Sequence, residues 1–87
     1  MNFRFSIEAG LLARGTMRSV LREAARDIEF AYSQARVYVS EDKSLLDSVF
    51  HFQATDLPDE AKAPIEHWYN GLMGKIDDYN VPNGFGI

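Results

Sequence analysis

The sequence predicts an α+β fold, in which a small antiparallel sheet is covered on one face by two amphipathic helices. Three segments alternate between apolar and polar residues, which indicates strands, and two segments carry apolar residues three and four apart, which indicates helices. Their order along the chain is β-α-β-β-α. Because the chain has only 87 residues, we expect a single domain spanning 1–87.

The first strand is expected in NFRFSIE, where Phe3, Phe5 and Ile7 alternate with polar residues. This pattern is typical of a strand with one buried face. The following segment AGLLARG (9–15) indicates a loop. Thr16 is the expected N-cap of the next helix, because its hydroxyl can accept a hydrogen bond from a free N–H of the first turn.

The first helix is expected to begin at Met17 and to end near residues 33–35. Its apolar stripe comprises Met17, Val20, Leu21, Ala24, Ile28, Ala31 and Tyr32. Phe30 lies about 220° from Met17 on a wheel of 100° per residue, well away from this stripe.

Two alternating segments, 35–42 and 45–55, predict a β-hairpin with a polar turn at 41–44. Val37 and Val39 share one side of the first strand. The apolar side of the second strand is expected to carry Leu46, Phe50, Phe52 and Ala54, and its other side Asp47, Val49, His51 and Gln53.

A second helix is expected from Pro64, which suits a first helical turn because it lacks the N–H and fixes φ. Gly71 and Gly74 each weaken this helix by roughly 1 kcal/mol relative to Ala. Residues 81–87 break the helix and form either a flexible tail or a short fourth strand. The apolar stripe comprises Ile65, Trp68, Tyr69, Leu72, Met73, Ile76 and Tyr79.

This order of elements matches the ferredoxin-like split β-α-β pattern, which is complete if residues 81–87 pair with the sheet. Two helices with one apolar stripe each can cover one face of such a sheet. Proteins with this arrangement have many unrelated functions, so the fold alone does not indicate a function.

Composition excludes several classes of protein. The chain has no cysteine, so it forms neither a disulfide scaffold nor a thiolate metal site. It has no signal-peptide pattern and no apolar run near the ~20 residues of a membrane span. We expect a cytoplasmic protein without a membrane partner. The net charge is −4, but residues 1–43 hold seven basic and six acidic residues, whereas residues 44–87 hold two and seven.

No catalytic or metal-binding pattern stands out, so we expect no cofactor and no enzymatic activity. His51 shares a strand face with Asp47, but residues four apart on a strand lie ~13 Å apart, too far for a hydrogen bond. His67 is expected on the outer face of the last helix. Neither a His-x-x-x-His nor a Cys-x-x-Cys spacing occurs. Tyr38 is the one aromatic residue on the predicted outer face of the sheet, unlike an RNA-binding sheet.

The main functional hint is a row of arginines spaced by four. Each step of four turns a helix by ~400°, so the last three form a slanting ridge, while the first is expected in the loop before the helix. Arg26 has Glu23 and Glu29 three residues away as expected partners. Arg18 and Arg22 have no acidic residue three or four positions away, so water, another element or another molecule must meet their charge. We call these residues the arginine row: Arg14, Arg18, Arg22 and Arg26.

We therefore predict a non-catalytic protein–protein interaction module of the adaptor or inhibitor type, which binds an acidic and apolar surface of a larger partner. Arginine would steer and orient the partner, and Phe30 would be a buried anchor. Three alternatives stay open: nucleic-acid backbone binding through the arginine row, a homodimeric or larger structural protein, and a merely solvated helix face. The expected interface comprises Leu11, Leu12, Arg14, Arg18, Arg22, Arg26 and Phe30.

Overall fold

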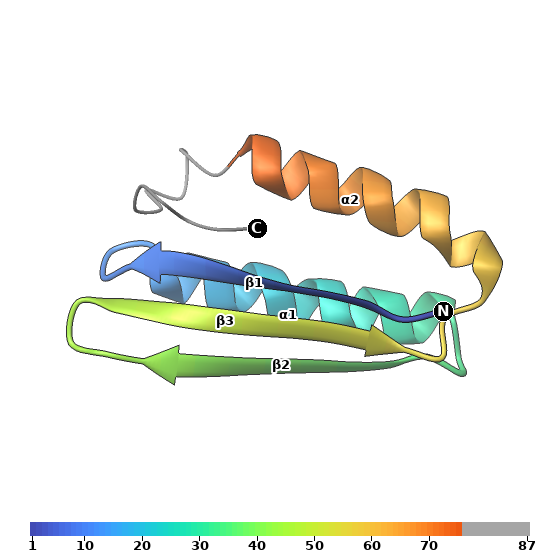
Figure 1. The fold of residues 1–87 in the computed structure, drawn as a ribbon, viewed down its shortest axis with the longest axis horizontal. Helices are drawn as coiled ribbons and strands as arrows, with labels where there is room; N and C mark the ends of the chain where they lie inside the picture. Colours follow the sequence, from blue (N-terminus) through green and yellow to red (C-terminus); the bar gives the residue numbers. More distant parts are fainter. Residues whose placement is uncertain (76–87) are drawn as a thin grey trace.

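The computed structural model describes residues 1–75, which form a three-stranded antiparallel sheet and two helices (Figure 1). The α+β class is therefore confirmed. Neither helix among these residues is long and apolar enough to cross a membrane. The stripe positions Ile76 and Tyr79 and the predicted tail or strand at 81–87 lie outside the described residues. The elements are β1 (Phe3–Gly10), α1 (Arg14–Ala31), β2 (Arg36–Lys43), β3 (Asp47–Thr55), the short 3-10 turn η1 (Asp59–Ala61) and α2 (Lys62–Gly74).

The strand β3 lies in the middle of the sheet, with the order β1-β3-β2. Phe52 of β3 stands opposite Phe5 on one side and Val39 on the other. Because β1 and β2 are both antiparallel to β3, they run parallel to each other and are connected by α1. This order is compatible with a ferredoxin-like arrangement, whose fourth strand would fall at 81–87, outside the described residues.

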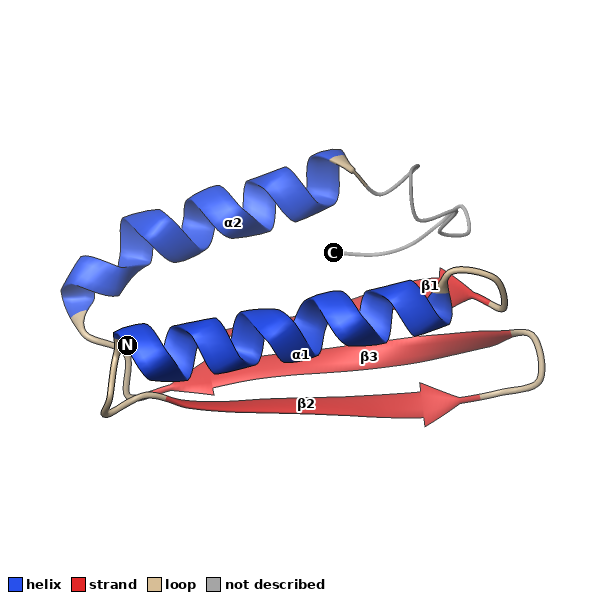
Figure 2. Ribbon diagram, turned by 180° about the vertical axis from the view of Figure 1, so that it is seen from behind, coloured by secondary structure: helices blue, strands red, loops and turns tan. Residues whose placement is uncertain are grey.

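The core lies between the sheet and α1, which runs along the strands (Figure 2). The second helix reaches this core through aromatic rings. The ring centroid of Trp68 lies 5.2 Å from that of Phe52, and that of Tyr69 lies 5.0 Å from that of Phe5. Such ring pairs add about 0.5–1.5 kcal/mol to the energy of burial alone. The core residues on β1, α1 and β3, all buried, are Phe5, Ile7, Ala9, Met17, Leu21, Ala24, Ile28, Phe50, Phe52 and Ala54.

The first helix begins and ends earlier than the sequence predicts, at Arg14 and Ala31. Thr16 is not its N-cap: the N-cap is Ala13, which makes no side-chain capping bond. Burial of Ala13 and a local turn take the place of a polar cap. The side chain of Ala13 is buried, and its N–H donates to the carbonyl of Gly10 at 3.1 Å. The start of α1 at Arg14 thus coincides with a buried Ala13 and a backbone turn, without a side-chain cap.

The hairpin turn also differs from its predicted position, because β2 continues to Lys43 and the turn spans residues 44–46. The N–H of Ser44 donates to the carbonyl of Asp47 at 2.8 Å and closes this turn. Leu46 is 70% exposed, so its predicted core position is wrong. The corresponding inward position on β3 belongs to Ser48, which is fully buried.

The substitution Gly71→Ala is expected to raise the free energy of unfolding by about 0.5–1 kcal/mol, because alanine loses less backbone entropy in a helix. Among residues 1–75, a Cβ at this position meets no heavy atom within 4 Å apart from the neighbouring helix backbone. Urea unfolding followed by circular dichroism measures the gain. Gly15→Ala is equally unobstructed, but Gly15 lies in the first turn of α1. We therefore expect a smaller increase in the free energy of unfolding for Gly15→Ala. A loss of stability in Gly71→Ala would contradict the helical packing described for α2.

Candidate functional site

The four arginines of the arginine row do not form one surface. Arg14 is the first residue of α1, so the prediction that it lies in the preceding loop is wrong. Its Nη1 donates to the carbonyl oxygens of Ser44 at 2.8 Å and Asp47 at 3.2 Å. The Arg14 guanidinium thus ties the start of α1 to the hairpin turn.

Arg18 is held by a two-bond ion pair with Glu41 of β2. Its Nε donates to Oε1 at 2.7 Å and its Nη2 to Oε2 at 2.9 Å. The hydroxyl of the buried Ser48 donates to Oε2 at 2.6 Å. The planar guanidinium matches the carboxylate geometry. The hydrogen bond from Arg18 lowers the pKa of Glu41 from 4.5 to about 2, assisted by Ser48 and opposed by desolvation.

The sequence contained a signal for this ion pair. Glu41 continues the alternation of Val37 and Val39, and so lies on the face of β2 that is directed toward α1. The sequence interpretation placed Glu41 in a polar turn and therefore missed it. The charge of Arg18 is met by another element of the same molecule.

The outer side of α1 carries Arg22, Arg26 and Phe30, which we call the Phe30 face. These residues follow at intervals of four, so they extend over ~12 Å of helix. All three are exposed, and Phe30 is 93% exposed. Among the described residues neither arginine forms an ion pair. The expected pairing of Arg26 with Glu29 is absent, because the Glu29 carboxylate accepts from the N–H of Val37 at 2.9 Å.

Leu11 and Leu12 lie at the opposite end of α1 from Phe30. They are 50% and 85% exposed, in the loop beside the hairpin turn that carries the exposed Leu45 and Leu46 (Figure 1). Sixteen helical steps separate Arg14, at the start of α1, from Phe30, which corresponds to ~24 Å of helix. The predicted interface residues are therefore split between two ends of α1.

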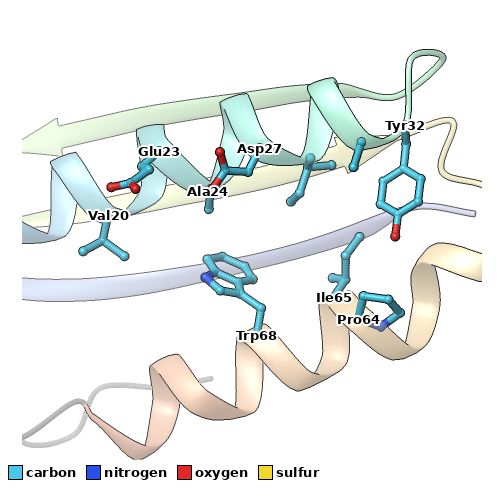
Figure 3. A pocket seen from close by; sticks show the side chains of 10 residues that line it. Val20, Glu23, Ala24, Asp27, Tyr32, Pro64, Ile65 and Trp68 are labelled. Carbon is cyan, nitrogen blue, oxygen red and sulfur yellow. The ribbon is translucent and has the colours of Figure 1, made fainter.

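An apolar cleft of about 390 Å³ separates α1 from α2 (Figure 3). The Trp68 ring extends from α2 into it, and the carboxylates of Glu23 and Asp27 lie on the α1 side. Sequence periodicity locates apolar stripes but not the distance between two helices, so the cleft was not predicted. Its lining residues are Val20, Glu23, Ala24, Asp27, Ile28, Ala31, Tyr32, Pro64, Ile65 and Trp68.

His51 lies on the outer face of the sheet and links all three strands. Its Nδ1 is 2.8 Å from the Ser6 hydroxyl, and its Nε2 is 2.8 Å from Asp42 Oδ2. The sequence analysis considered only Asp47, on the same strand, as a partner of His51. It missed Ser6 and Asp42 because they lie on the neighbouring strands β1 and β2. The His51 and Asp42 side chains are 46% and 77% exposed, so water competes for these bonds.

Within residues 1–75, no group of three or more histidine, aspartate or glutamate side chains is placed to hold a metal ion. Comparison with known proteins adds no further constraint: no protein-family model, no curated protein and no solved structure matches this chain.

Proposed function

We propose that this protein is a non-catalytic interaction module that binds another protein through the Phe30 face. The observation that carries the proposal is the 93% exposure of Phe30 on the outer side of α1. Burial of a phenylalanine side chain contributes about 1.5–3 kcal/mol. Phe30 contributes almost none of this to the fold, so its burial can stabilise a complex.

The two neighbouring arginines define the chemistry of the partner. Arg22 and Arg26 are exposed and have no ion pair among the described residues. A guanidinium binds carboxylates in a fixed geometry, and complementary charge speeds and orients association. The matching surface is an apolar pocket for Phe30 with carboxylates beside it. Arg14 and Arg18 leave the proposed interface, because both are bonded within the molecule.

Nucleic-acid binding is the weaker alternative. A duplex-binding protein that makes about 6–10 phosphate contacts shows strong salt dependence. The Phe30 face offers two arginines for such contacts, since the other two of the row are engaged with Ser44, Asp47 and Glu41. Self-association is the other alternative, in which the Phe30 face meets a second copy across a two-fold axis.

The substitutions Phe30→Ala and Arg22→Glu/Arg26→Glu are each expected to weaken partner binding at least about tenfold, or ~1.4 kcal/mol. Quantitative affinity capture from the native host identifies the partner, and titration with the purified partner measures the loss. Because Phe30 is exposed, Phe30→Ala should change the free energy of unfolding by less than about 0.5 kcal/mol. The matched control is Arg4→Glu/Lys62→Glu, which makes the same charge change at exposed positions elsewhere.

Equal binding by the wild type and both Phe30-face variants would refute the proposed interface. Nucleic-acid binding would instead survive Phe30→Ala and fall steeply with salt. Self-association would appear as a dimer mass in light scattering of the purified wild type, converted to a monomer mass by Phe30→Ala.

A further inference from the structure

We propose that the α1–α2 cleft binds a small amphipathic amine, a molecule with an apolar chain and one protonated amino group. This site is separate from the Phe30 face and does not depend on it. The proposal rests on the size of the cleft, its apolar walls and the two carboxylates on its α1 side.

The cleft has the size and lining of a small-molecule site. Its volume of about 390 Å³ lies within the range of roughly 300–1,000 Å³ that such sites occupy. The buried side chains of Ile28 of α1 and Ile65 of α2 line it. The Trp68 ring extends into it from α2 (Figure 3). An alkyl chain in this space would remove apolar surface of both helices from water.

The charge of the cleft selects a cation. Glu23 and Asp27 lie one turn apart on α1, an arrangement of like charges that costs a few tenths of a kcal/mol. Among the described residues neither carboxylate has an ion pair or a side-chain hydrogen bond, and no Lys or Arg lines the cleft. A bound ammonium group would relieve this repulsion, and the face of Trp68 can add a cation–π contact. A fatty acid of the same chain length would meet only like charge.

The chain itself offers no cation from its last segment. Residues 76–87 contain Asp77 and Asp78 and no basic residue. Placing that segment in the cleft would add negative charge beside Glu23 and Asp27. An external amine therefore fits the cleft better than this part of the chain.

Trp68 makes the proposal testable, because it is the only tryptophan in the chain and it lines the cleft. The full chain is titrated with octylamine, octanol and octanoate at pH 7, below their aggregation concentrations, while Trp68 emission is recorded. We expect octylamine to bind at least about tenfold more tightly than octanol, and octanoate to bind more weakly than either.

Matched variants separate the charge contribution from general hydrophobicity. Glu23→Gln/Asp27→Asn should weaken octylamine binding at least about fivefold and leave octanol binding unchanged. The control Asp59→Asn/Glu66→Gln removes the same two charges at exposed positions outside the cleft, and should bind octylamine as the wild type does.

Three results would overturn the proposal. Equal affinity for the three ligands would show that charge plays no part, and equal loss in both double variants would show that only net charge matters. Emission unresponsive to every ligand, as expected with a protein segment or residues 76–87 seated in the cleft, would show that no small amine binds there.

Discussion

Replacement of Phe50 by alanine is expected to leave the protein largely unfolded near room temperature. Phe50 is fully buried in the middle of the central strand, opposite Ile7 of β1 and Glu41 of β2. Removal of a buried phenylalanine ring costs about 3–5 kcal/mol, because burial is lost and a cavity remains. A domain of this size has a total stability of only about 5 kcal/mol.

The measurement is urea unfolding followed by circular dichroism, with Phe30→Ala as the matched control. Both substitutions remove the same atoms, but Phe30 is 93% exposed and should cost less than about 0.5 kcal/mol. Phe50→Leu loses less volume and should leave a measurable transition, weakened by about 1–2 kcal/mol. A loss below about 1 kcal/mol in Phe50→Ala would show that Phe50 is not the packing centre.

The substitution Glu41→Gln is expected to destabilise the protein at neutral pH and to have almost no effect near pH 2. The hydrogen bond from Arg18 lowers the pKa of Glu41 to about 2 in the folded state, against 4.5 for the free group. The folded state therefore favours the carboxylate. The stabilisation that the ionised Glu41 gives to the folded state is complete above about pH 4.5 and is lost as the pH falls toward 2. At neutral pH we expect Glu41→Gln to lower the free energy of unfolding by about 1–2 kcal/mol. This is less than the full pKa shift implies, because water partly screens the ion pair.

Urea unfolding of the wild type and Glu41→Gln at several pH values between 7 and 2 gives the difference in stability directly. Glu66→Gln, at an exposed position of α2, provides the control for a simple change in net charge. A difference between wild type and Glu41→Gln that stays constant over this pH range would mean that the Arg18–Glu41 ion pair contributes nothing as a charge pair.

The secondary structure was largely predictable because the apolar periodicity is regular. Phe3, Phe5 and Ile7 define β1, and the stripe from Met17 to Ile28 defines the buried side of α1. The errors occur where a tertiary contact overrides a local signal. The buried Ala13 precedes a helix that begins before Thr16, and β2 continues to Lys43, so that Glu41 lies in the strand and not in the turn expected at 41–44.

The candidate surfaces were predictable only in part, for a similar reason. The helical wheel placed Phe30 away from the apolar stripe, and its exposure follows from that angle alone. Arg18 forms an ion pair with Glu41, whereas Arg22 forms none among the described residues. The spacing along one helix does not predict this difference, because it depends on distances between elements. The cleft likewise depends on how far α2 stands from α1.

The middle position of β3 also determines what can happen while the chain is being synthesised. Of the three strands, β1 leaves the ribosome first, yet Phe3 pairs with Ala54 near the end of β3. Until β3 has emerged, β1 lacks its sheet partner, whereas α1 can already form from local contacts. Nascent chains that stop before β3 therefore carry a strand without its sheet partner, a state that favours aggregation.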